Sequence, residues 1–287
     1  MTTRPTSGRP SDGGDVSRIY GEQAAQQSAA DGRRAACAEV LGVRVDAVDL
    51  QEVLCRFEDA LLGQDCQVVH LCNAYNVLLA SKQERYREVM NAGDLNLPDG
   101  TATLLAARLL GAPMRGRVAG PDLLTAVCAW GVDRSVRHFF YGGTPASLEA
   151  MLNAARSAYP GIKIAGSYAP PFRPLSPEEA DDVCRRINRA GAQVVWVGLG
   201  TPKQDEWMEA FRHRIEANVL VGVGAAFDFL SGSRQRAPRW MQRAGFEWLH
   251  RLGSEPRRLW RRYLIGNPEF VVRFAVSWRR RRAGWGA

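Results

Sequence analysis

Two hydrophobic periods alternate along most of this chain. From about residue 39, short runs rich in β-branched and aromatic residues are followed by longer segments of helical period. Strands that alternate with helices in this way are typical of βαβ units and a parallel sheet. The run Val-Val-Trp-Val-Gly at 194–198 is apolar throughout, as expected of a central strand buried on both faces. We therefore predict an α/β, Rossmann-like domain with a mostly parallel sheet flanked by helices. The expected strands cover residues 39–45, 67–71, 95–97, 137–141, 162–168, 193–198 and 218–222, and the expected helices cover 48–62, 74–92, 101–110, 121–130, 145–158, 177–190 and 202–214.

The composition excludes several classes of protein. The chain is 46% hydrophobic and has eight tryptophans, which is typical of a folded protein. Its sequence contains no apolar run of the roughly 18 residues that span a bilayer, and its N-terminus lacks the apolar stretch of a signal peptide. The six cysteines form no Cys-x-x-Cys pair, and the four histidines are scattered. We expect reduced thiols, no metal site and a cytoplasmic location.

Charge is distributed unequally. The whole chain carries a formal charge of +8, but residues 233–287 contain 14 arginines and three acidic residues. That segment has a net charge of +11, and residues 1–232 have −3. This asymmetry predicts a polyanionic partner for the C-terminal part, either nucleic acid or an anionic membrane surface. We divide the chain into a disordered leader (1–35), an α/β core (36–232), a basic helical appendage (233–276) and a charged tail (277–287).

Two strand-to-helix corners share one pattern. Tyr141-Gly-Gly-Thr-Pro and Gly198-Leu-Gly-Thr-Pro each combine a strand end, a glycine turn, a threonine suited to the N-cap and a proline suited to the first helical position. Ligands of such sheets bind outside the carboxyl ends of the strands, and helix N-termini attract phosphate. The alternative is simple capping, since Thr201 and Gln204 have the spacing of a capping box. The candidates for anion binding are Gly142, Gly143, Gly200, Thr201 and Lys203.

Polar residues follow other expected strands. Asp99, in Leu95-Asn-Leu-Pro-Asp-Gly-Thr, is placed to act as a general base at a cleft. The position also suits an N-cap, which these residues alone favour. Asn73 can likewise face the cleft or cap a helix, whereas His70 fits a core histidine. In Val221-Gly-Val-Gly-Ala-Ala-Phe-Asp, Gly224 lets the backbone approach a ligand and Asp228 can accept from ribose hydroxyls, although tight packing would need the same glycines.

The segment 237–264 is dense in arginine and tryptophan. Two apolar groups fall at helical spacing, one around Trp248 and one around Trp260, with arginines beside the second. Such helices can lie in a membrane interface, where arginine meets lipid phosphate. One alternative is a helical cap that closes the main domain. Another is a nucleic-acid-binding surface, but the sequence contains no recognisable nucleic-acid-binding motif to support it.

Several common motifs are missing from the sequence. It contains no P-loop, no dinucleotide-binding Gly-x-Gly-x-x-Gly, no Gly-x-Ser-x-Gly and no His-Glu-x-x-His. The sequence also lacks Asp-x-Asp, which argues against a divalent ion that bridges a nucleotide diphosphate.

Four stretches together resemble the WecG/TagA/CpsF family of bacterial glycosyltransferases, over residues 40–273. Each is weak alone, but their common order and spacing are specific. They are Leu97-Pro-Asp-Gly with Gly120-Pro-Asp-Leu; Phe140-Tyr-Gly-Gly-Thr-Pro; Gly198-Leu-Gly-Thr-Pro-Lys-Gln-Asp; and Gly222-Val-Gly-Ala-Ala-Phe-Asp-Phe-Leu-Ser-Gly ahead of Ala237-Pro-Arg-Trp and Glu247-Trp-Leu-His-Arg-Leu.

The resemblance implies an inverting, metal-independent enzyme without a cofactor. It would move a sugar, N-acetylmannosamine-like or a related hexose, from a UDP-sugar to a polyprenyl-diphosphate-linked acceptor in cell-surface polysaccharide biosynthesis. The family works at the cytoplasmic face of the membrane, so the C-terminal segment is expected to meet anionic lipid and not nucleic acid. The sequence leaves open the oligomeric state, a homo-oligomer included, and also a non-catalytic module that binds nucleotide, membrane or nucleic acid.

The resemblance also assigns roles to residues. Asp99 matches the catalytic aspartate, and Gln204 and Asn73 match side chains of the active site. Asp228 and the glycines near it match the nucleotide-binding region. The arginines that match the appendage thought to complete the site are Arg251, Arg257, Arg258 and Arg261. The sequence departs from the family at one position. Many members have Thr-Pro-Asn where this chain has Leu71-Cys72-Asn73, so the threonine hydroxyl is missing. This difference bears on the identity of the donor sugar and of the acceptor.

Overall fold

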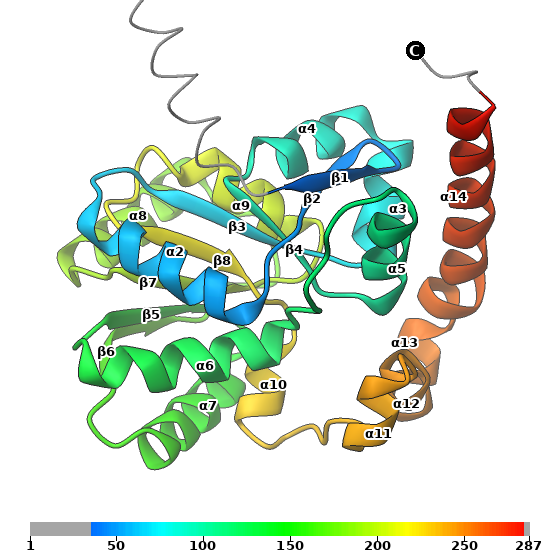
Figure 1. Cartoon of the computed structure of the whole chain (residues 1–287). Coiled ribbons are helices and arrows are strands. Elements are labelled where there is room, and N and C mark those ends of the chain that lie inside the picture. Colours follow the sequence, from blue (N-terminus) through cyan, green and yellow to red (C-terminus); the bar gives the residue numbers. More distant parts are fainter. Residues whose placement is uncertain (1–35, 284–287) are drawn as a thin grey trace, which may run out of the picture. The chain divides into compact units, whose positions relative to one another are not determined.

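The computed structural model describes residues 36–283, and its centre is a six-stranded sheet in which all neighbouring strands are parallel (Figure 1). The strand order is β4-β3-β8-β7-β5-β6. A separate antiparallel hairpin precedes it. The predicted α/β fold with a mostly parallel sheet is confirmed. The hairpin strands are β1 (Cys37–Val40) and β2 (Val43–Asp46), and the sheet strands are β3 (Gln67–Cys72), β4 (Leu95–Pro98), β5 (Arg137–Gly142), β6 (Lys163–Tyr168), β7 (Val194–Gly198) and β8 (Val219–Gly222).

Helices cover both faces of the sheet (Figure 1). Strands β3, β5, β7 and β8 are almost entirely buried between them, which explains their continuous apolar runs. The helices of the core are α2 (Leu50–Leu62), α3 (Ala74–Lys82), α4 (Glu84–Ala92), α5 (Thr101–Leu109), α6 (Gly120–Asp133), α7 (Pro145–Ala158), α8 (Pro177–Arg189), α9 (Lys203–Phe211) and α10 (Ala226–Leu230).

The C-terminal appendage consists of short helices followed by one long helix. The long helix α14 packs on α3 through Phe270 and the half-buried Phe274. The indole of Trp278 donates to the carbonyl of Leu109 on α5 at 3.2 Å, and Arg281 pairs with Glu39 of β1 at 2.7 Å. The appendage is therefore tied to the α3–α5 side of the core. Its elements are α11 (Arg239–Arg243), α12 (Glu247–Ser254), α13 (Pro256–Trp260), the π-helical turn η1 (Arg261–Ile265) and α14 (Gly266–Arg282).

Three expected elements differ in the structure. The strand expected at 39–45 is a hairpin, because Leu41 (φ +51°) and Gly42 (φ +85°) form a two-residue turn. The helix expected at 74–92 is two helices, because Gln83 has extended backbone (φ −125°, ψ +106°). Helix α14 continues through the boundary expected at 276 as far as Arg282, so residues 277–282 extend the appendage. The expected leader, 1–35, lies outside the described residues.

The two strand-to-helix corners also differ from each other. At the first, Thr144 caps α7, Ser147 completes a capping box and Pro145 is the first helical residue, as predicted. At the second, α9 begins only at Lys203 and has no side-chain cap, so the predicted Thr201 cap is wrong. Gln204 instead reaches back to the turn, where its Oε1 accepts from the N–H of Gly200 at 3.2 Å.

The close approach of these corners gives a stability prediction. Gly142 has φ +131°, and a Cβ there would lie 2.6 Å from the carbonyl carbon and oxygen of Gly198. We expect Gly142→Ala to lower the free energy of unfolding by about 1–3 kcal/mol more than Gly111→Ala, because both glycines have positive φ but only Gly142 lacks space. A Cβ at Gly111 (φ +90°) would have no atom within 4 Å. Urea denaturation measures both; equal losses would contradict the close contact between the corners.

Candidate functional site

Two cavities open at the carboxyl edge of the sheet. We call the first, of about 430 Å³, cavity A, and the second, of about 800 Å³, cavity B. Cavity A lies between the ends of β3 and β4, the start of α6 and helix α12, and cavity B lies over the turns after β5, β7 and β8. Asp99 lines both cavities, and so do Leu71, Asn73, Tyr75, Val223, Ala225, Arg251 and Arg262.

Asp99 is held at the junction by the sheet itself. The backbone N–H groups of Asp99 and Gly100 both donate to the carbonyl of Cys72 at the end of β3, at 3.0 and 3.2 Å. A Cβ at Gly100 would lie 3.1 Å from Cα and Cβ of Asn73, so glycine allows this close approach. The N-cap of α5 is Gly100, and no side chain caps that helix. The capping role that the sequence favoured for Asp99 is therefore wrong, and its carboxylate faces the cavities.

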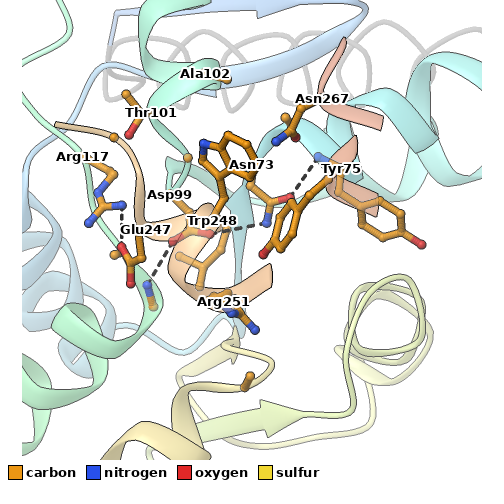
Figure 2. Close-up of a pocket in the computed structure, with 18 of the residues that line it drawn as sticks. Asn73, Tyr75, Asp99, Thr101, Ala102, Arg117, Glu247, Trp248, Arg251 and Asn267 are labelled. Atoms are coloured by element: carbon orange, nitrogen blue, oxygen red, sulfur yellow. Dashed lines mark hydrogen bonds and ion pairs between the residues drawn. The ribbon is translucent and has the colours of Figure 1, made fainter. Parts of the chain in front are cut away.

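Asn73 has both of the roles considered for it. Its Oδ1 accepts from the N–H groups of Tyr75 (3.1 Å) and Asn76 (3.4 Å) and caps α3. Its Nδ2 donates to Oδ2 of Asp99 at 3.4 Å, while the N–H of Gly120 donates to Oδ1 at 3.3 Å. Figure 2 shows the carboxylate of Asp99 beside the amide of Asn73. The cap fixes the amide, and the amide orients the carboxylate.

A pair of opposite charges adjoins the carboxylate. Arg117, in the loop before α6, pairs with Glu247 of α12 at 2.8 Å (Figure 2). Burial raises the pKa of Asp99; Arg117 lowers it and Glu247 raises it, in decreasing order of effect. A carboxyl group with a raised pKa at a cleft is suited to accept a proton.

Two arginines of the appendage reach the same place. Nη2 of Arg262 donates to Oδ1 of Asn73 at 3.3 Å, and its guanidinium lies 4.4 Å from the ring centroid of Tyr75. Its Nε is buried and has no hydrogen-bond partner among the described residues. Burial lowers the pKa of Arg262, and the nearby positive charge of Arg251 lowers it further. Two adjacent cations with unused donors favour an anionic ligand.

Cavity B is lined by turns of small residues. Gly143, Gly200 and Gly224, all with positive φ, lie along it, together with Thr201. The buried Gln204 packs against Gly222, where a Cβ would lie 2.9 Å from its Nε2. The turns thus keep backbone groups close to the cavity wall, as phosphate binding requires.

Charged residues complete cavity B. Asp228 lines it and pairs with Arg234 at 3.0 Å. Arg258 and Arg261, at the junction of α13 and η1, line it from the appendage. Cavity B therefore has two carboxylates from the core, Asp99 and Asp228, and several arginines from the appendage.

The structure brings together most of the residues expected from the sequence. Asn73, Asp99, Gly143, Gly200, Thr201, Gln204, Gly224, Asp228, Arg251, Arg258 and Arg261 line the cavities. Gly142, Lys203 and Arg257 line neither; Gly142 is buried against Gly198, and the other two are exposed.

The expected site omitted Arg262, Arg117, Glu247 and Trp248, which all line cavity A. Arg262 is one of four arginines in six residues, and the sequence pattern does not distinguish it from its neighbours. Arg117 lies in an irregular loop with no periodicity. Glu247 carried a signal, because it is one of only three acids among the last 55 residues.

Metal-ligating clusters and bilayer-spanning helices are two further features that bear on function. Among residues 36–283, no group of three or more His, Cys, Asp or Glu side chains is arranged to hold a metal ion. Within the same part of the chain, no helix combines the length and apolar character needed to cross a bilayer.

Known proteins are similar to this chain over most of its length. An N-acetylglucosaminyldiphosphoundecaprenol N-acetyl-beta-D-mannosaminyltransferase of Bacillus spizizenii (strain W23) is 34% identical over 193 residues, which cover 67% of this chain and 72% of that protein. Proteins of the same name from Bacillus subtilis (strain 168) and Staphylococcus aureus (strain MW2) are 32% and 25% identical, over 71% and 84% of this chain and 77% and 93% of their own.

The model of the glycosyl transferase WecG/TagA/CpsF family matches residues 38–284. The chain belongs to this family of glycosyltransferases, as the sequence motifs predicted.

Proposed function

We propose that this enzyme transfers a sugar from a UDP-sugar in cavity B to a hydroxyl of a lipid-linked acceptor in cavity A, with inversion and without a metal ion. The observation that carries this proposal is the position of Asp99, whose carboxylate lines both cavities. A base at such a junction can touch an acceptor on one side and face the donor on the other.

The reaction is a single displacement. The carboxylate of Asp99 takes the proton of the acceptor hydroxyl, and the oxygen attacks the anomeric carbon from the face opposite UDP. The new C–O bond forms as the bond to the diphosphate breaks, and UDP leaves with the electron pair. The amide of Asn73 and the N–H of Gly120 hold the carboxylate in place.

The leaving diphosphate needs positive charge. Arg251, Arg258, Arg261 and Arg262 line cavity B, and the glycine turns add backbone N–H groups. Arg262 has an unused Nε donor among the described residues. We propose that these fixed charges serve in place of a divalent ion.

The far part of cavity B suits the nucleoside. Asp228 offers a carboxylate to ribose hydroxyls, and Phe172 is an aromatic residue on the wall, 88% exposed. An exposed phenyl ring at a cavity wall can stack on a base.

The relatives indicate the class of substrates. Their name describes transfer of an N-acetyl-β-D-mannosaminyl group to N-acetylglucosaminyldiphosphoundecaprenol. We propose an N-acetylmannosamine-like donor sugar and a polyprenyl-diphosphate-linked acceptor for this chain also, in cell-surface polysaccharide biosynthesis. Leu71 lines both cavities beside Gly120, where a Cβ would lie 2.7 Å from its Cδ1, so an apolar side chain borders the reacting groups.

The appendage suits an anionic membrane surface on the cytoplasmic side. It exposes large apolar side chains together with arginines, a combination that is favourable at a lipid interface. The exposed apolar residues are Trp240, Phe246, Leu249, Trp260, Leu264, Ile265, Val271, Val272 and Val276, and the exposed arginines include Arg257, Arg258, Arg261, Arg273, Arg279 and Arg280.

Replacement of the base tests the proposed reaction. We expect Asp99→Asn to lower kcat by about 10²- to 10⁴-fold, the usual contribution of a general base, and to leave UDP binding nearly unchanged. The assay uses radiolabelled UDP-sugars and a polyprenyl-diphosphate-linked acceptor, with and without EDTA, which should not alter turnover. Asp133→Asn, at an exposed residue that ends α6, is the matched control. Turnover near that of wild type in Asp99→Asn would refute the assignment.

The charges beside Asp99 predict the direction of a pH effect. Catalysis requires ionised Asp99, so kcat/KM should fall as pH decreases through its raised pKa. Glu247→Gln removes a negative charge that raises this pKa, so the acidic limb of the profile should move to lower pH. Arg117→Gln removes a positive charge that lowers it, so the limb should move to higher pH. Shifts in the same direction would show that the limb does not report Asp99.

Membrane attachment is tested at the exposed face of α14. Val271 and Val272 are 58% and 62% exposed. We expect their double replacement by serine to lower partitioning onto anionic vesicles by about tenfold, since full burial of an aliphatic side chain contributes roughly 1.5–3 kcal/mol. Leu62→Ser, at an 82% exposed residue of α2 in the core, is the control and should have no effect. Equal loss in both variants in a sedimentation assay would contradict attachment through the appendage.

A further inference from the structure

The segment between α10 and α11 connects the core to the appendage and contains two arginines two residues apart. Arg234 and Arg236 each contact one carboxylate of the core and one of the appendage. Neither arginine lines cavity A or cavity B. Any effect that they have on the site must therefore act through the residues that they hold.

Arg234 joins α10 to α13. Its Nε lies 3.0 Å from Oδ2 of Asp228 and its Nη1 pairs with Oε1 of Glu255. Glu255 is the residue before α13, and its other oxygen pairs with Nε of Arg258 at 2.7 Å. Asp228 and Arg258 line cavity B, so this chain of ion pairs begins and ends at that cavity. We call it the B clasp.

Arg236 joins α6 to α12. Its Nη1 and Nη2 contact both oxygens of Asp122, with Nη2 at 3.2 Å, and its Nε lies 3.7 Å from Oε1 of Glu247. The other oxygen of Glu247 accepts from Arg117 at 2.8 Å. Glu247 and Arg117 line cavity A. We call this second chain the A clasp.

Helix α12 is only half-buried, and the ring of Trp248 lies 5.9 Å from that of Tyr263. No residue of this helix is fully buried, although Glu247, Trp248 and Arg251 all project from it toward cavity A (Figure 2). The side chains of Arg234 and Arg236 are 30% and 24% exposed, and each forms ion pairs with two carboxylates, of which the Arg236–Glu247 pair is electrostatic only, without a hydrogen bond. An isolated ion pair at the surface contributes little to the free energy of folding. A partly buried guanidinium that contacts two carboxylates at once, however, fixes the relative position of the elements that carry them.

We propose that Arg234 and Arg236 are positioning residues, which hold the appendage over the two cavities, one clasp for each substrate. The A clasp sets α12 and with it Arg117, Glu247 and Arg251 beside the acceptor. The B clasp sets the start of α13 and with it Arg258 beside the donor diphosphate. The assignment of substrates to clasps rests on the proposed function, whereas the mechanical role of the clasps does not.

Steady-state kinetics of the full-length enzyme on vesicles test the selectivity. We expect Arg236→Gln to raise KM for the lipid acceptor about five- to tenfold and KM for the UDP-sugar less than twofold; Arg234→Gln should do the reverse. Arg87→Gln is the matched control, because the 35% exposed Arg87 pairs with Glu84 within α4 and lines neither cavity. Lysine at either position keeps the positive charge but not the two parallel donors of a guanidinium. The KM values of Arg236→Lys and Arg234→Lys should therefore lie between those of wild type and the glutamine variants.

A double-mutant cycle separates a clasp from general destabilisation. Asp122→Asn and Arg236→Gln act on the same ion pair. The KM for the lipid acceptor in the double variant should therefore be no higher than in the more affected single variant. Equal increases of both KM values in each arginine variant, or additive effects in the cycle, would overturn the proposal.

Amide hydrogen exchange tests the clasps without substrate. Exchange in residues 247–260 should be faster than wild type in both glutamine variants and unchanged in the Arg87→Gln control. High salt should increase the exchange of this segment in wild type as well. Unchanged exchange in both variants would also overturn the proposal. If wild type transfers nothing from UDP-sugars but these exchange changes occur, the proposed function fails and the clasps stand.

Discussion

The parallel pairing of β3 with β4 is the constraint on which the site depends. Cys72 pairs with Pro98, so the next residues of the two strands leave the sheet side by side. The carbonyl of Cys72 then accepts the N–H groups of Asp99 and Gly100. Asn73 and Asp99, 26 residues apart in sequence, thereby come within hydrogen-bonding distance. The rest of the site is arranged around this junction, with the glycine turns of cavity B on one side and helix α12 of the appendage beside cavity A.

The appendage does more than cover the site, because it supplies charges that act on Asp99. Glu247 of α12 raises the pKa of Asp99, and Arg117 of the core lowers it while paired with Glu247. The pKa of Asp99 therefore depends on where α12 lies.

The sequence predicted the sheet well, because buried parallel strands leave continuous apolar runs that few other elements show. It also placed Asp99 and Asn73 at strand ends, but it favoured a cap for Asp99, since a carboxylate before a helix looks the same whether or not it bonds to the helix. The hairpin at 37–46 and the break at Gln83 depend on single backbone angles that composition does not reveal. In the appendage, the resemblance named Arg257, which is exposed outside both cavities, and not Arg262, which lies in the π-helical turn and lines both.

The raised pKa of Asp99 has a consequence for stability. A carboxyl group whose folded-state pKa lies above its unfolded value contributes stability that is present at low pH and lost as pH rises through the folded-state pKa. At the pH where Asp99 is ionised and can act as a base, it therefore destabilises the fold. Arg262 has the complementary property, because burial disfavours its charged form.

The site thus keeps an anion, Asp99, and a cation, Arg262, that are both poorly solvated and both contact the amide of Asn73. Burial disfavours the charged form of each group. An acceptor hydroxyl would stabilise the carboxylate by a hydrogen bond, and a diphosphate would stabilise the guanidinium by an ion pair. Binding of both substrates would then stabilise the closed site more than either alone.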